Sequence, residues 1–141
     1  MIEWYKKVVF ENYSNFKGRA RRSEYWYFAL ANGLISILLI VIGAVIGGIF
    51  GDPITGGIIG YILFGLYSLA TLLPGLGVVV RRLHDVDKSG WFYFIFLIPF
   101  IGGIWLLILF CTEGTHGPNQ YGQDPKNETE DINEIGKVEL Q

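Results

Sequence analysis

Apolar positions run almost without interruption from residue 25 to residue 80, where Asp52 is the only charged side chain. A soluble domain of this size needs charged positions that face water, whereas a hydrocarbon solvent does not. The segment is long enough for two spans, about 25–50 and 54–80, with Asp52 and Pro53 between them. Asp52 suits the N-cap of the second helix, and Pro53 its first position, where a missing N–H is harmless. The pattern therefore predicts an integral membrane protein.

A further apolar run over 91–111 predicts a third span of about the length that crosses a bilayer. Pro99 and the pair Gly102-Gly103 predict a kink inside it. Cys111 closes the run and is the only cysteine in the chain. One cysteine excludes an internal disulfide and a cysteine-based metal cage.

Pro74 predicts a kink in the last third of the second span. Its ring leaves the carbonyl of Ala70 without a helical hydrogen bond. In a membrane such a carbonyl needs an internal donor. The nearby hydroxyl groups are those of Ser68 and Thr71, and we expect one of them to supply the bond.

The segments outside the spans are polar. The leader, residues 1–15, mixes Lys and Glu with apolar and aromatic side chains at helical spacing, which predicts an amphipathic helix at the membrane interface. The tail is dense in turn residues up to Pro125, and 126–141 is polar, acidic and predicted to be disordered. The predicted fold class is all-α: one membrane domain over 1–125, with about three transmembrane helices, the amphipathic helix before them and an irregular acidic C-terminal tail.

Glycines repeat every four residues at the end of the first span, at Gly43, Gly47 and Gly51. A face without side chains lets another helix backbone approach closely, and packing rather than hydrophobicity holds helices together in lipid. Incidental glycine in a glycine-rich chain is the alternative. We favour close packing, and contact within the chain over dimerisation.

Two clusters of charge flank the spans. Arg19, Arg21, Arg22 and Glu24 precede the first span, and Arg81, Arg82, His84, Asp85, Asp87 and Lys88 follow the second. Lys and Arg favour the cytoplasmic side of a membrane. We therefore expect both clusters on that side, the Asp52 turn outside and, after three crossings, the tail outside as well.

The second cluster has two interpretations. His84 beside two carboxylates could bind a cation or relay protons. Three cationic side chains in the same ten residues would repel a cation, however, and nothing there has metal-ligand spacing. We favour a network of interfacial charges that fixes the span ends and binds anionic headgroups, with no metal site.

Antiparallel neighbouring spans would place the two clusters at the same depth. Helices pack about 8–10 Å apart, within reach of long side chains. We therefore expect cross-span ion pairs: Glu24 with Arg81 or Arg82, and Asp85 with Arg21 or Arg22.

Four motifs occur in one order: FKGRARRSEYW before the first span, RRLHDVDKSGW after the second, IPFIG in the third, and G-x-x-G-x-N-x-Y-G-x-D-P in the tail. Together they resemble the domain of unknown function 805, a family of small bacterial inner-membrane proteins, over roughly residues 4–125. The chain departs from that pattern at Val86-Asp87, where Thr-Gly or a similar pair is common. The resemblance implies a multi-pass protein of the bacterial inner membrane, and it implies no reaction.

Enzyme signatures are missing from the sequence, which has no Gly-x-Ser-x-Gly elbow, phosphate loop or His-Glu-x-x-His motif. We expect a non-enzymatic membrane protein without a catalytic residue or cofactor. Its expected partners are anionic lipids and membrane proteins, including copies of itself, and no nucleic acid. The alternative is a small oligomeric channel or transporter subunit, although no ionisable residue lies at mid-depth in the spans. A lipid-modifying enzyme that uses His84 and Asp85 is a third, weaker hypothesis.

Overall fold

The computed structural model describes residues 1–126. Most of the tail predicted to be disordered, residues 127–141, lies outside this range. The described chain is all-α and separates into two compact units. Unit 1 comprises Met1–Ser14 and Trp26–Gly75, and unit 2 comprises Asn15–Tyr25 and the chain from Leu76 onward.

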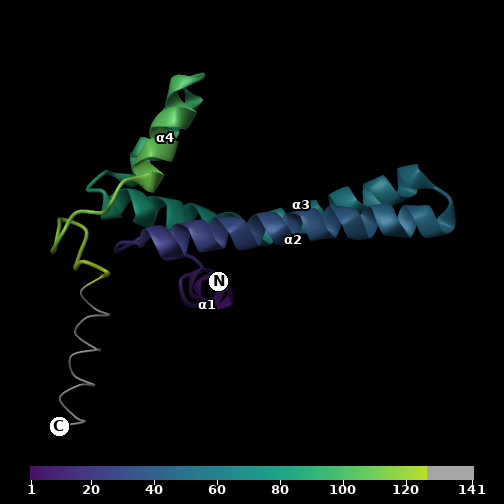
Figure 1. Cartoon of the computed structure of the whole chain (residues 1–141), viewed down its shortest axis with the longest axis horizontal. Coiled ribbons are helices and arrows are strands. Elements are labelled where there is room, and N and C mark those ends of the chain that lie inside the picture. The colour runs from purple at the N-terminus through teal and green to yellow at the C-terminus, as the bar shows by residue number, and fades with distance from the viewer. Residues whose placement is uncertain (127–141) are drawn as a thin grey trace, which may run out of the picture. The chain divides into compact units, whose positions relative to one another are not determined.

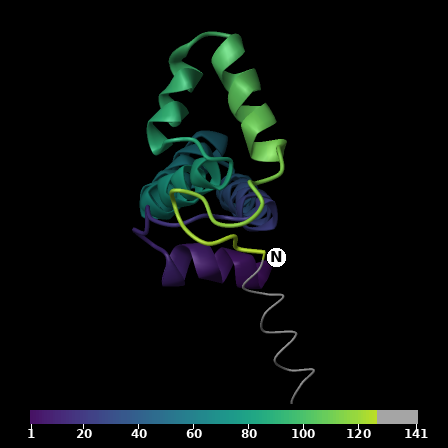
Figure 2. The same cartoon turned by 90° about the vertical axis from the view of Figure 1, so that its left-hand side faces the viewer.

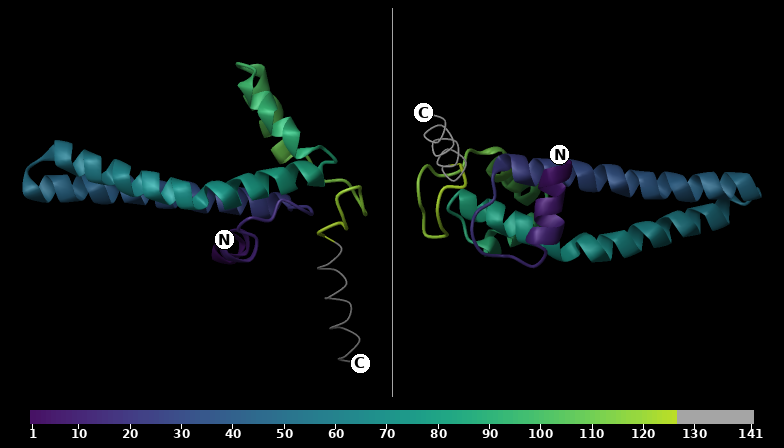
Figure 3. Two further views of the ribbon diagram at one scale, coloured as in Figure 1. Left: turned by 180° about the vertical axis from the view of Figure 1, so that it is seen from behind. Right: turned by 90° about the horizontal axis from the view of Figure 1, so that it is seen from below.

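Two long helices, α2 (Arg22–Phe50) and α3 (Pro53–Asp85), account for the first two predicted spans. In unit 1 they run antiparallel and side by side, joined by a tight turn (Figures 1 and 3). Their 29 and 33 residues give lengths of about 43 and 50 Å at 1.5 Å per residue, more than the hydrocarbon core requires. Large apolar side chains on both helices are exposed, among them Leu34, Ile49 and Leu69. Such a surface suits lipid rather than water.

Small residues allow the close approach of α2 and α3. A Cβ atom on Gly43 would lie 2.7 Å from the carbonyl oxygen of Gly56, and one on Gly47 would lie 2.8 Å from the Cα of Gly56. A Cβ on Gly60 would lie 3.2 Å from the carbonyl oxygen of Ile40. The glycine stripe of α2 therefore faces glycines of α3 in the same chain, which is the packing that was expected of Gly43 and Gly47.

The turn between the spans contains the predicted N-cap at Asp52, but Gly51 does not pack against a helix as predicted. Asp52 caps α3, since its carboxylate accepts hydrogen bonds from the amides of Ile54 and Thr55 at 3.1 and 3.3 Å. The Thr55 hydroxyl bonds it too, and these contacts lower the pKa of Asp52. Gly51 was predicted to pack against a helix, but a Cβ there would meet nothing within 4 Å. Its φ of +68° shows that the turn requires glycine.

The leader is helical, as predicted, and consists of α1 (Ile2–Lys6) continued by the wider π-helical turn η1 (Lys7–Glu11). The hydroxyl of Tyr5 lies 2.9 Å from that of Tyr67, which donates to the Asn32 side chain at 2.8 Å. The Tyr5 ring also stacks on Phe28 at 5.8 Å. A polar chain thus joins the leader to both long helices.

Pro74 lies within α3, and a side chain of the leader bonds the carbonyl that it frees. The Tyr13 hydroxyl donates to the Ala70 carbonyl at 2.8 Å. The expectation that Ser68 or Thr71 would do so is wrong, because the Thr71 hydroxyl bonds the Tyr67 carbonyl one turn earlier, at 3.0 Å. A hydroxyl within the helix reaches back towards its own preceding turn, so the donor comes from outside.

The predicted third span over 91–111 is wrong. The chain forms a short 3₁₀ helix, η2 (Gly90–Leu97), turns, and returns as α4 (Ile101–Cys111), which packs along η2 (Figure 2). Phe100 at the turn has a φ of +66°. A Cβ on Gly102 would lie 2.6 Å from the carbonyl carbon of Ile95 and 2.9 Å from the Cα of Phe96, so only glycine allows the two arms to meet. Pro99 and Gly102 therefore produce a reversal and not a kink.

The hairpin of η2 and α4 packs on the end of α3. Leu83, Leu106 and Phe110 are buried together, and Phe92 and Ile95 pack against them. Both ends of the hairpin therefore lie near the C-terminal end of α3, and the tail resumes there. The expectation of an outside tail depended on a third crossing by one helix over 91–111, which the hairpin replaces. The side of the membrane on which the tail lies stays a prediction.

Candidate functional site

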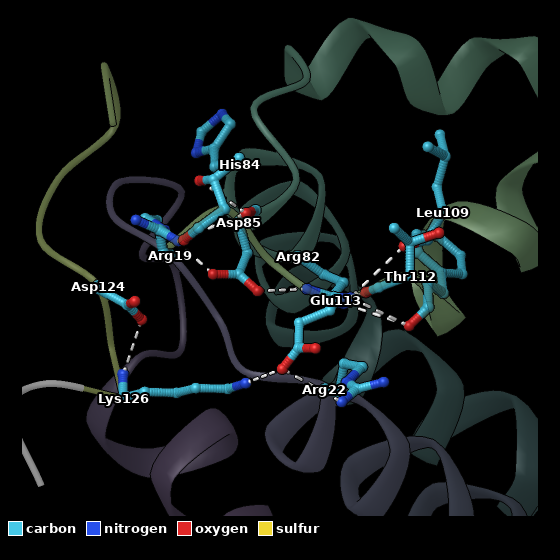
Figure 4. Close-up of polar contacts among 12 residues, drawn as sticks. Arg19, Arg22, Arg82, His84, Asp85, Leu109, Thr112, Glu113, Asp124 and Lys126 are labelled. Atoms are coloured by element: carbon cyan, nitrogen blue, oxygen red, sulfur yellow. Dashed lines mark hydrogen bonds and ion pairs between the residues drawn. The ribbon is translucent and has the colours of Figure 1, made fainter. Parts of the chain in front are cut away.

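The charged side chains of unit 2 gather where three segments meet: the residues before α2, the last two turns of α3 and the chain after α4 (Figure 4). Backbone hydrogen bonds hold the segments together. The Ala20 amide donates to the Arg81 carbonyl at 3.0 Å, and the Thr115 amide donates to the Asp85 carbonyl at 2.8 Å. We call the following set the polar cluster: Arg19, Glu24, Arg81, Arg82, His84 and Asp85.

Asp85 lies at the centre of the polar cluster and is 4% exposed. Its carboxylate accepts a hydrogen bond from Arg19 Nε at 3.0 Å and another from Arg82 Nη1. A Cβ on Gly114 would lie 2.7 Å from Asp85 Oδ1. One carboxylate therefore serves two guanidinium groups, and glycine in the tail leaves the space that it occupies.

The same two arginines bind backbone carbonyls. Arg19 Nη1 donates to the Gly117 carbonyl at 2.7 Å. Arg82 donates to the Phe110 carbonyl at 3.3 Å and to that of Thr112. The last carbonyls of a helix lack helical donors and carry partial negative charge. Arg82 thus caps α4, and Arg19 attaches the tail to the residues that precede α2.

Glu24 and Arg81 form a second buried pair. Arg81 Nη1 donates to Glu24 Oε1 at 2.6 Å, and the two side chains are 4% and 1% exposed. Arg81 Nε and Nη2 are also buried, and neither has an acceptor within hydrogen-bonding distance among residues 1–126. An unpaired buried N–H costs about 1–3 kcal/mol, so Glu24 is the contact that makes the burial of Arg81 tolerable.

His84 has structural contacts through its ring and through its backbone carbonyl. Its ring stacks on Tyr121, with centroids 3.9 Å apart and planes 3° apart. Its Nδ1 donates to the Gly18 carbonyl at 3.0 Å, and the side-chain amide of Asn119 donates to the backbone carbonyl of His84 at 2.9 Å. Over residues 1–126 no three His, Cys, Asp or Glu side chains are grouped to hold a metal ion. His84 thus joins Gly18 to the tail.

A cavity of about 300 Å³ opens beside the polar cluster, and most of its lining residues have polar or charged side chains. Arg22 and Lys126, which are about half exposed, both pair with the carboxylate of Glu113. The hydrogen bond from Lys126, with the charges of Lys126 and Arg22, lowers the pKa of Glu113. The lining residues are Arg21, Arg22, Ser23, Asp85, Gly114, His116, Asp124, Pro125 and Lys126.

The carboxylates in this wall are already engaged. Asp124 is buried and accepts hydrogen bonds from the amides of Gly117 and Lys126, each at 3.0 Å. Although burial raises the pKa of Asp124, these amides bring it below the usual value. Asp85 is held by its two arginines. Arg22 and Lys126, two cations that line the cavity, therefore share one carboxylate partner, that of Glu113.

The predicted cross-span pairs are partly confirmed. Glu24 pairs with Arg81, as expected. The pairing of Asp85 with Arg21 or Arg22 is wrong: the partners are Arg19 and Arg82. The chain turns at Gly18, whose φ is +81°, and this turn directs Arg19 towards the end of α3. Two straight antiparallel helices would not bring Arg19 to this place without such a turn.

Lys88 and Asp87 lie apart from the polar cluster. The Lys88 ammonium lies 5.5 Å from the centroid of the Phe92 ring. Asp87 accepts a hydrogen bond from the Gln120 side chain at 3.1 Å. Its φ of +58° is in the region that favours glycine, the residue that is common at this position in the similar family.

Functional contacts in the tail were missed by reasoning from the sequence. Thr115, Asn119, Tyr121 and Asp124 all bind or support the polar cluster. Asn119, Tyr121 and Asp124 are fixed positions of the tail motif, which was their signal, whereas Thr115 is at a variable position of it. Composition alone, rich in glycine and turn residues, predicted an irregular segment without partners.

Comparison with known proteins identifies the family. Residues 13–123 match the family model described as protein of unknown function (DUF805). The chain belongs to this family. It is 46% identical over 125 residues to the inner membrane protein YhaI of Escherichia coli strain K12, covering 89% of this chain and 97% of YhaI. It is 42% identical over 127 residues to the inner membrane protein YhaH of the same strain, covering 90% of this chain and 99% of YhaH. No solved structure gives a significant match.

The family also establishes location. This DUF805 member is a bacterial inner-membrane protein with two candidate membrane spans, α2 and α3. The matched region, residues 13–123, includes both long helices, the polar cluster and the hairpin, together with most of the described part of the tail.

Proposed function

We propose that this protein is a non-enzymatic membrane protein that binds the headgroups of anionic lipids in the basic cavity of unit 2. The observation that carries the proposal is the cavity itself, about 300 Å³ in volume, with Arg21, Arg22, His116 and Lys126 in its wall. A phosphodiester headgroup is a compact anion, and guanidinium groups bind phosphate oxygens with paired, charge-assisted hydrogen bonds.

The charge of unit 2 supports the proposal. Residues 15–25 and 76–126 contain eight Lys and Arg but five Asp and Glu, an excess of three positive charges. The acids near the cavity are held by hydrogen bonds within the protein, and Glu113 is shared by two cations. Each Lys or Arg near an anionic membrane surface contributes about 1 kcal/mol to binding. Two cavity cations are therefore enough for measurable selectivity between anionic and zwitterionic lipid.

Thermal unfolding in a mild neutral detergent tests the proposal. Phosphatidylglycerol should raise the melting temperature of the wild type more than phosphatidylcholine does at the same concentration. The double variant Arg21→Gln/Lys126→Gln should lose most of this difference. The matched control Lys6→Gln/Lys7→Gln removes two cations from the leader and should keep it. Equal stabilisation by both lipids, or an equal loss in both double variants, would exclude a site in the cavity.

The structure offers no observation that favours an oligomeric channel over this proposal. The glycine stripe that could have joined two copies is used within the chain, where Gly43 and Gly47 face Gly56. Ion flux through liposomes that hold only this protein separates the two functions, because a pore raises flux and a lipid-binding protein does not.

A further inference from the structure

The hairpin of η2 and α4 has an apolar outer face that no described residue of unit 2 covers. Its most exposed side chains are those of Trp91, Leu97, Phe100, Ile101, Ile104 and Ile108, which are 59–91% exposed. No charged residue occurs between Lys88 and Glu113. A continuous apolar surface of this kind marks contact with a membrane or another protein.

The length of the hairpin limits the choice. The eight residues of η2 rise about 2.0 Å each and the eleven of α4 about 1.5 Å each, so each arm is about 16 Å long. The hydrocarbon core of a bilayer is about 30 Å thick. Neither arm can cross it, but either arm matches the depth of one leaflet.

The two ends of the hairpin are polar and cationic. Lys88 precedes η2, and Arg22 and Arg82 donate hydrogen bonds to the carbonyls of Cys111 and Thr112 at the end of α4. An apolar element with cations at its base complements a leaflet, which presents anionic headgroups above an apolar layer. The charge arrangement thus favours lipid over a second protein chain as the occupant.

We propose that residues 90–111 insert into a single leaflet without crossing the bilayer, and that acyl chains of that leaflet cover the outer face of the hairpin. The leader and the tail then lie on the same side of the membrane, and the protein crosses it twice. This inference goes beyond headgroup binding in the cavity. Its tests measure sidedness and contact with acyl chains rather than selectivity for lipid charge, so the two proposals can fail separately.

Single cysteines in full-length protein, in a Cys111→Ala background, test the sidedness. Ser14→Cys reports on the leader, Gln123→Cys on the tail and Ile54→Cys on the turn between α2 and α3; all three positions are exposed. A membrane-impermeant maleimide applied to intact cells should label Ile54→Cys alone. Ser14→Cys and Gln123→Cys should become reactive together, once the membrane is opened. Labelling of the leader and the tail from opposite sides would overturn the proposal.

The outer face is tested with Ile104→Cys and Ile108→Cys in the same background, so that failure of one variant to fold leaves the other. A fluorophore on either cysteine should be quenched at least twofold by lipids with brominated acyl chains in proteoliposomes, and neither thiol should react with the impermeant maleimide in opened membranes. Reaction as fast as that of Gln123→Cys would show that the face lies in water. Disulfide-linked dimers through either cysteine in native membranes would show that a second copy covers it. Each of these results would overturn the proposal.

Discussion

Removal of one member of the Glu24–Arg81 pair should destabilise the protein strongly, whereas removal of both should cost much less than the sum of the two single losses. The 2.6 Å contact places the charge centres about 4 Å apart, which at an effective dielectric of about 20 corresponds to about 4 kcal/mol of attraction. Arg81 has no other side-chain acceptor within residues 1–126. Glu24→Gln leaves the buried Arg81 guanidinium without its carboxylate, and Arg81→Met removes the guanidinium that Glu24 binds. Either change alone should lower the free energy of unfolding by about 3–5 kcal/mol.

The double variant Glu24→Gln/Arg81→Met removes both charges and the two unpaired N–H groups of Arg81. Its loss should fall well below the sum of the single losses, with a coupling energy of about 2–4 kcal/mol. The free energy of unfolding is measured by SDS titration in mixed micelles, followed by circular dichroism. The control cycle uses Arg22→Met and Glu113→Gln, a half-exposed pair 3.7 Å apart, and should show little coupling. Additive losses at Glu24 and Arg81 would refute the reasoning.

Three further outcomes are expected. Gly56→Ala should destabilise the protein by about 1–3 kcal/mol, because the new Cβ would meet backbone of α2, whereas Gly57→Ala meets open space and should not; melting temperatures in detergent compare them. Tyr13→Phe leaves the Ala70 carbonyl without its donor and should lower the melting temperature and loosen the leader in hydrogen exchange, and unchanged exchange would contradict this role. Glu113 has a lower pKa in the folded protein than in the unfolded chain. Its negative charge therefore stabilises the fold at pH values above the unfolded-state pKa, and this stabilisation is lost as pH falls through the folded-state pKa. The melting difference between wild type and Glu113→Gln should therefore be present at neutral pH and vanish in acid, and a constant difference would contradict it.

The two spans could be predicted from the sequence because their physical signal is strong. A stretch of 56 residues whose only charge is Asp52 is stable in the hydrocarbon of a bilayer but not in water. An Asp that can cap a helix, followed directly by Pro, shows where the stretch divides into two helices. Gly43 and Gly47 were likewise expected to pack closely, since in lipid small residues mark helix contacts. Gly51 continued the same spacing for a different reason, its positive φ, which spacing alone does not reveal.

The hairpin could not be predicted, because a run of twenty apolar residues fits a span as well as two short arms. The choice depends on contacts between residues far apart in sequence, such as Leu83 with Leu106, and on a left-handed conformation at Phe100, where glycine would be expected. Pro99 indicated that the helix is interrupted, but an interrupted helix can continue or reverse.

The polar cluster was half predictable. The charged residues can be read from the sequence, and the Glu24–Arg81 contact follows because antiparallel spans place the two charged clusters at the same depth. The partners of Asp85 do not, because they depend on the turn at Gly18 and on a tail whose composition suggested no fixed structure. Buried charges need partners in every direction, and the tail supplies the acceptors at Thr112 and Gly117.

Native mass spectrometry of the protein released from mild detergent tests the binding of anionic headgroups most directly. Wild-type protein, incubated with equal amounts of phosphatidylglycerol and phosphatidylcholine, should carry the anionic lipid at several times the occupancy of the zwitterionic one. Arg21→Gln/Lys126→Gln should bring the two occupancies close together, while Lys6→Gln/Lys7→Gln should leave the ratio as in the wild type. Equal occupancy of the two lipids on the wild type would contradict the account.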